Sequence, residues 1–217
     1  MSNTGITPST ASGLEPESVA EMLQTYQKQI IVGAIVLVAA GGGFWMWRRS
    51  AEIREGRAGE AYQAAEAAFA SGNMPLAQTE LEKITGRYAG TAPGTQAAML
   101  LAQVHFGQGK YDEGMRVLEA ASSKAPAPLK SGLQALMGAG LEGSSKPAEA
   151  AAAYGKAAEL SQFDIDRDMY RMEQARILAT SGDAAGAGKI YLEIGQREDS
   201  PFAGEAKVRL GEQQAKP

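Results

Sequence analysis

The sequence predicts an all-α fold in which a single transmembrane helix precedes an α-solenoid of helix hairpins. Three observations predict it: an 18-residue run without a charged side chain, a body that repeats at intervals of 36 or 37 residues, and glycine or serine turns inside each repeat. A sequence period of this length is typical of stacked helix pairs.

The composition excludes several kinds of site. The chain has no cysteine and one histidine, so disulfides, thiolate metal sites and cysteine nucleophiles are excluded. Its net charge of -4, with both signs interspersed, provides no positive field for nucleic acid. We expect no cofactor and no resident metal. No combination of acid, base and nucleophile stands out, so we do not expect an enzyme.

The N-terminal part divides in two. Residues 1–15 are small and polar without an apolar period, and we expect a disordered tail there. Residues 16–49 are expected to form a juxtamembrane and transmembrane helix, because Pro16 suits a first helical turn.

The run from Ile30 to Trp47 has the length of a membrane span. As a helix it would measure about 27 Å, and aromatic rings and arginines close one end, as at a lipid interface. We therefore expect residues 30–47 to contact the lipid bilayer. A buried soluble helix and a cleaved signal peptide are the alternatives, but the run is long and uncharged, and the segment before it is long and acidic.

Four stretches after the run can be aligned with one another. They begin at Ser71, Gln108, Ser144 and Ser181, with offsets of 37, 36 and 37 residues. Each contains a turn, then a small residue, then a large apolar residue four positions later, so that the last two share one helix face. The turns are at Gly72, Gly109, Ser145 and Gly182, the small residues are Ala77, Gly114, Ala150 and Ala187, and the large residues are Leu81, Leu118, Tyr154 and Tyr191.

A second helical pattern precedes each turn. It is clearest where Ala98, Leu101 and His105 recur at three- and four-residue intervals, which predicts a packing role for this histidine. Residues 50–217 are thus expected to form about four helix hairpins, with a capping helix at residues 200–213.

The second and third repeats resemble the tetratricopeptide repeat. Ala102, Gly114, Leu118, Ala121 and Pro126 occupy its small, small, large, small and proline positions. The repeats are longer than the usual length of about 34 residues. In the third repeat the matching residues are Gly138, Leu141, Ala150, Tyr154 and Ala157.

The whole layout resembles the YfgM-type ancillary subunits of the bacterial SecYEG translocon. A short tail, one span closed by aromatic residues and arginine, and a run of long repeats carry this resemblance over residues 17–217. It implies a single-pass protein of the bacterial inner membrane. Its repeat domain would face the periplasm, with translocon subunits, chaperones or exported polypeptides as partners.

The basic residues favour the opposite orientation. Lys28 is the only basic residue before the run, whereas four arginines follow it closely, so the positive-inside rule would place the repeat domain in the cytoplasm. The resemblance favours the periplasm, and the cytoplasmic orientation stays open. The four arginines are Arg48, Arg49, Arg54 and Arg57.

The stretch DIDRD begins like a calcium-binding loop. However, Met169 stands where that loop needs glycine, and Ala175 stands where it needs glutamate. We expect instead that Asp164, Asp166 or Asp168 caps the following helix.

The resemblance to tetratricopeptide repeats implies a groove lined by the first helix of each repeat. A methionine and aromatic surface re-packs around varied apolar segments and suits peptide-like partners. The other interpretation is that these apolar residues fill the core between repeats. The predicted protein-binding groove comprises Tyr62, Glu66, Phe69, Gln96, Met99, Gln103, Phe106, Met169, Met172 and Arg176.

Together these features predict a non-enzymatic, membrane-anchored module for protein–protein interaction, ancillary to the translocon or to periplasmic chaperones. One alternative is a scaffold that associates with further copies of itself in envelope assembly or cell division. Another is a regulatory scaffold that faces the cytoplasm.

Overall fold

A computed structural model describes residues 16–215, and the tail predicted for residues 1–15 lies outside this range. The described residues form helices joined by short turns, without a strand. The elements are α1 (Pro16–Ala70), α2 (Met74–Arg87), α3 (Ala92–Gly107), α4 (Tyr111–Ser122), the 3-10 turn η1 (Ala127–Leu129), α5 (Lys130–Gly143), α6 (Pro147–Leu160), α7 (Asp164–Thr180), α8 (Ala184–Gly195) and α9 (Ala203–Gln214).

The chain divides into two units after Glu52. In the first unit, α1 carries the apolar run, whose length and composition are sufficient to cross a membrane. None of its apolar window is buried, and Leu37 and Val38 are 74% and 75% exposed. Exposure on all sides argues against a core helix of a soluble domain.

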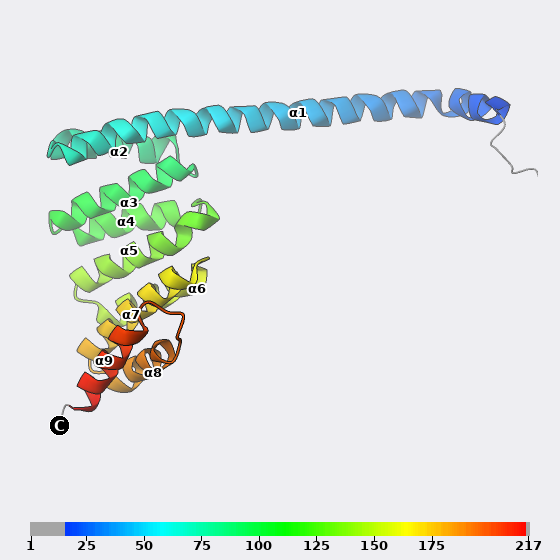
Figure 1. The fold of residues 1–217 in the computed structure, drawn as a ribbon. Helices are drawn as coiled ribbons and strands as arrows, with labels where there is room; N and C mark the ends of the chain where they lie inside the picture. The colour runs from blue at the N-terminus through cyan, green and yellow to red at the C-terminus, as the bar shows by residue number, and fades with distance from the viewer. Residues whose placement is uncertain (1–15, 216–217) are drawn as a thin grey trace, which may run out of the picture. The chain divides into compact units, whose positions relative to one another are not determined.

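The second unit is a stack of helix hairpins. The remainder of α1 forms the first hairpin with α2, through a cluster that contains Ala65 and Leu81. The hairpins α3/α4, α5/α6 and α7/α8 follow in chain order, and each packs on the next (Figure 1). The predicted all-α repeat architecture is confirmed.

The four predicted turns share one backbone feature. Gly72, Gly109 and Gly182 have φ angles of 78°, 74° and 98°. Glycine adopts this left-handed region without steric cost, which explains why it recurs at the same place in the repeat. In the third repeat Ser145 has a φ of 61°, and it is the one non-glycine residue with positive φ between residues 16 and 215.

The small and large residues after each turn are buried, as predicted. Ala77, Ala150 and Ala187 are fully buried, as are Leu81 and Leu118. The small residues let the two helices of a hairpin approach closely, and the large ones fill the space beside them.

Two residues that follow the apolar run bind the turn at the end of the first repeat. Arg54 donates hydrogen bonds to the carbonyl oxygens of Arg87 and Ala89, at 3.3 and 3.2 Å, where α2 ends. Glu55 accepts one from the N–H of Ala92, at 2.8 Å, where α3 begins. Helix ends leave such groups without partners inside the helix, so these two side chains stabilise the turn between α2 and α3.

The expectation that an aspartate caps α7 is wrong. Its N-cap is Phe163, without a side-chain cap, and the helix already begins at Asp164. Asp164 and Asp166 therefore lie inside the first turn, where their charges still suit the positive end of the helix. Asp168 is buried and accepts a hydrogen bond from Arg197 at 2.6 Å.

The last helix covers the end of the stack. On α9, Ala206 is fully buried and packs with residues of α7 and α8, together with Leu210 and with Phe202, which directly precedes the helix. A terminal helix with one apolar side removes an otherwise exposed hydrophobic surface from water.

Candidate protein-binding surface

The α1 residues of the predicted groove are partly engaged in packing. Tyr62 and Phe69 lie half-buried against the cluster shared by α1, α2 and α3. Glu66 is exposed and accepts a hydrogen bond from the Tyr62 hydroxyl at 3.5 Å. Burial raises the pKa of Tyr62, and the neighbouring Glu66 carboxylate raises it further. Only Glu66 of the three presents its side chain mainly to solvent.

The α3 residues divide in the same way. Met99 and Phe106 are half-buried in a cluster formed with α4 and α5, whereas Gln96 and Gln103 are exposed. Phe106 also lies beside Tyr111, with ring centroids 5.7 Å apart. The apolar pair therefore contributes to contacts between hairpins, and the two glutamines provide free amide groups.

On α7 each predicted residue has a different environment. Met172 is buried, 8% exposed, whereas Met169 is 39% exposed. Arg176 binds both carboxylate oxygens of Glu142 on α5, at 2.8 Å each, and donates a third bond to Glu173 at 2.8 Å. A guanidinium engaged by two carboxylates is not free to hold a partner's acidic group.

The structure brings the α1 and α3 residues onto neighbouring hairpins. The α7 residues are separated from them by the hairpin α5/α6, so they belong to another part of the stack (Figure 1). The exposed members of the predicted groove are Glu66, Gln96, Gln103 and Met169.

The predicted groove contains no residue of α5, which is the first helix of the third hairpin. Its Glu142 lies 36 residues after Phe106, which is one of the repeat offsets, so this position was available from the sequence. The hydrogen bond from Arg176 lowers the pKa of Glu142, against the opposing effect of partial burial. Among residues 26–215, no three acidic or histidine side chains converge as they would around a metal ion.

An exposed apolar helix and a stack of hairpins with a period of 36 or 37 residues define a repeat protein of the α-solenoid class. The chain belongs to the family described as tetratricopeptide repeat-like domain, whose model matches residues 21–193. The match includes the apolar run as well as the hairpins. A comparison with curated protein sequences gives no match.

Solved structures share the fold. A putative kinesin light chain with nearly identical TPR-like repeats, from Podosopora anserina, superposes with a TM-score of 0.58 and 15% identity, covering 73% of this chain and 86% of that chain. MamA from Desulfovibrio magneticus RS-1, residue 41 to its end, gives a TM-score of 0.50 and 19% identity, with coverages of 73% and 78%. A MamA RS-1 double mutant gives 0.51 and 18%, with coverages of 74% and 78%.

Proposed function

We propose that this chain is a membrane-anchored, non-enzymatic module for protein–protein interaction, ancillary to a translocon or to periplasmic chaperones in a bacterial inner membrane. One observation carries the proposal: the family match extends from a helix whose apolar window is not buried through a tetratricopeptide repeat-like stack, a fold that generally mediates protein–protein interaction. Such an anchor keeps the stack close to other membrane proteins and raises its effective concentration there, so weak contacts suffice.

The exposed glutamines suit partners of varied sequence. Gln96 and Gln103 lie on α3 with exposed side chains. Each amide offers both donors and an acceptor, which match the backbone of an extended polypeptide without selecting its side chains. The polar members of the predicted groove therefore support the proposal better than its apolar members.

A photo-crosslinking experiment in intact cells tests the use of this surface. A crosslinking amino acid at Gln103 is expected to capture translocon subunits, chaperones or exported chains. The matched control position is Lys156, which is exposed on α6, a helix without any predicted groove residue. Adducts only between copies of the chain would instead identify a self-associating scaffold. Equal capture at both positions would contradict the proposed surface.

The orientation is tested by adding protease to spheroplasts. We expect digestion of the repeat domain, since the resemblance implies a periplasmic location. Protection of the domain would place it in the cytoplasm and favour the regulatory scaffold. Arg54, one of the four arginines that argue for that orientation, is engaged in stabilising the turn between α2 and α3, so its presence has a structural reason.

A further inference from the structure

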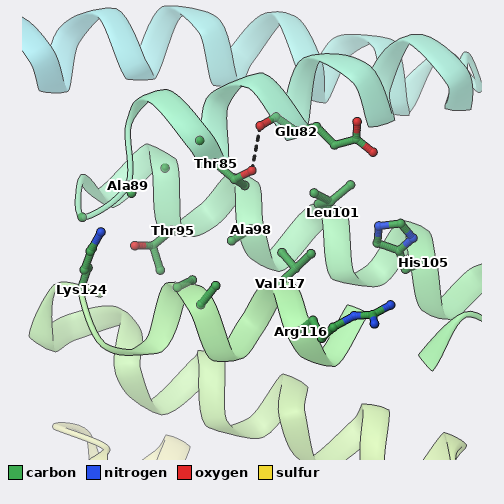
Figure 2. A pocket seen from close by; sticks show the side chains of 15 residues that line it. Glu82, Thr85, Ala89, Thr95, Ala98, Leu101, His105, Arg116, Val117 and Lys124 are labelled. Atoms are coloured by element: carbon green, nitrogen blue, oxygen red, sulfur yellow. Dashed lines mark hydrogen bonds between the residues drawn. The ribbon is translucent and has the colours of Figure 1, made fainter. Parts of the chain in front are cut away.

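A cavity of about 600 Å³ lies beside α3, between α2 and α4. Side chains from all three helices line it (Figure 2). Successive residues of an α-helix are rotated by about 100° around its axis, so the α3 residues that line the cavity lie roughly 140° around the helix from those of the predicted groove. The cavity positions are Gly94, Thr95, Ala98, Leu101 and His105, and the groove positions are Gln96, Met99, Gln103 and Phe106.

Small residues keep this cavity open. Gly86 on α2 has no atom within 4 Å of the place where a Cβ would stand, and Ala120 on α4 is exposed. Along α3 the lining extends from Gly94 to His105, which is about 16 Å at about 1.5 Å per residue. A volume of about 600 Å³ falls within the range of ligand-binding clefts. The space would therefore accept several large apolar side chains of one segment.

The polar groups of the cavity favour an acidic ligand. His105 is 8% exposed, and its Nδ1 atom is buried without a hydrogen-bond partner. Arg116 lies at the same end as His105, whereas Lys124 lies at the opposite end (Figure 2). Glu82 is the one acidic side chain among the lining residues. Arg116 already pairs with Glu113 at 3.6 Å, so Lys124 is the cation of the lining that has no carboxylate partner among the described residues.

We propose that this cavity is a second binding site, which takes a short protein segment with large apolar side chains and at least one carboxylate. The apolar side chains would fill the space beside Gly86 and Ala120, and a carboxylate would pair with Lys124. A polar group of the segment would bond the unpartnered His105. The site is independent of the predicted groove, because it lies on the other side of α3.

The test uses the full chain in nanodiscs of phosphatidylcholine and two fluorescein-labelled 12-residue peptides. Both peptides have the same leucine face, and their remaining positions are glutamate in one and lysine in the other. Fluorescence anisotropy is expected to show at least tenfold tighter binding of the glutamate peptide. Equal binding of the two peptides would overturn the proposal.

Two pairs of variants locate the binding. Gly86→Leu fills the cavity and is expected to weaken binding of the glutamate peptide at least tenfold. Gly56→Leu, at another open helical glycine outside the cavity, is expected to leave the affinity unchanged. Lys124→Glu is expected to weaken binding of the same peptide, whereas Lys156→Glu is expected to leave it unchanged. If circular dichroism shows that Gly86→Leu is unfolded, Ala120→Leu fills the cavity from the opposite wall.

Two further outcomes decide the assignment. Unchanged affinity in the folded cavity-filling variant would overturn the site. Replacement of Gln96 and Gln103 by lysine is expected to leave the affinity of the glutamate peptide within twofold. A larger change would assign the peptide to the predicted groove and not to the cavity. If the cavity does not bind the peptide, the crosslinking experiment at Gln103 still tests the proposed function separately.

Discussion

Glycines in this chain determine how closely neighbouring helices approach. The ring of Phe106 occupies the space that a Cβ would need at Gly114 on α4 and at Gly140 on α5. One aromatic side chain thus fits against two glycines on different hairpins. Close packing of this kind tolerates added volume poorly, because side chains must leave their preferred rotamers.

Gly140→Ala is expected to lower the free energy of unfolding by about 1–3 kcal/mol, because the new methyl group overlaps Phe106. This loss opposes the gain of up to about 1 kcal/mol that alanine brings to an open helical site. Urea unfolding monitored by circular dichroism measures the change. Gly56→Ala, where nothing lies within 4 Å of the added Cβ, is the control and should be neutral or stabilising. Equal behaviour of the two variants would contradict the packing role of Phe106.

The ion pair between Arg176 and Glu142 makes stability depend on pH. Because the pKa of Glu142 lies below its usual value of 4.5, the pair stabilises the folded chain above that pH. The stabilisation disappears as the pH falls through the lowered pKa. Glu142→Gln is expected to lower the free energy of unfolding by about 0.5–1 kcal/mol at neutral pH, since the pair is partly exposed to solvent.

The same variant should approach the unmodified chain as the pH falls through the lowered pKa, because Glu142 then becomes protonated in the folded as well as in the unfolded state. Urea unfolding at several pH values provides the measurement, and Glu149→Gln, at an exposed position, provides the control. A difference that persists unchanged at low pH would show that the carboxylate charge is not its cause.

Among the helices, α7 is linked by an ion pair to the segment between α8 and α9. Its Asp168 is 1% exposed and bonds Arg197, which lies between α8 and α9. One oxygen of this carboxylate, Oδ2, is buried without a partner. A buried charge of this kind depends strongly on the one cation that it has. The pair therefore holds the segment before α9 against α7.

Asp168→Asn is expected to speed amide hydrogen exchange in residues 196–202 and in α9 by about tenfold or more, because that segment loses its charged partner. Exchange in α3 should stay unchanged. The matched control is Asp199→Asn, since this exposed carboxylate lies 3.4 Å from the same Arg197. Faster exchange throughout the domain would indicate global destabilisation and contradict a local role.

The turns could be predicted from the sequence, whereas the partition of the groove residues between core and surface could not. A left-handed turn requires glycine or a tolerant residue, so Gly72 and Gly109 mark their positions directly. Met169 and Met172 have the same chemistry and nearly the same helix face, yet only the second is buried. Met172 packs against residues of α8 and α9, and no local pattern records which helices will cover which side of α7. The start of α7 was missed for a related reason, because Phe163 has no capping side chain.

In the complete chain, the two tryptophans report on the proposed anchor. Trp45 and Trp47 are the only tryptophans of the sequence, and both are 69% exposed. Indole rings favour the interface between lipid and water, so we expect them near the headgroups of a bilayer.

Brominated lipids test this placement. Bromine at acyl carbons 6 and 7 is expected to quench the tryptophan fluorescence of reconstituted chain about twofold more than bromine at carbons 11 and 12. A lysine at the centre of a membrane helix costs about 2.5–3.5 kcal/mol of insertion free energy. Replacing both Val36 and Val38 by lysine should therefore abolish the quenching, because the run no longer inserts. Stronger quenching by the deeper bromines would contradict an interfacial position.

The bonds that Arg54 and Glu55 make to the first repeat have a consequence for turnover. Six residues separate Trp47 from Arg54, and all of them belong to α1. Proteases nick exposed loops in preference to regular helix. The cell would therefore have no ready place to cut the repeat stack from the proposed anchor, and we expect both parts to be degraded together with a single half-life.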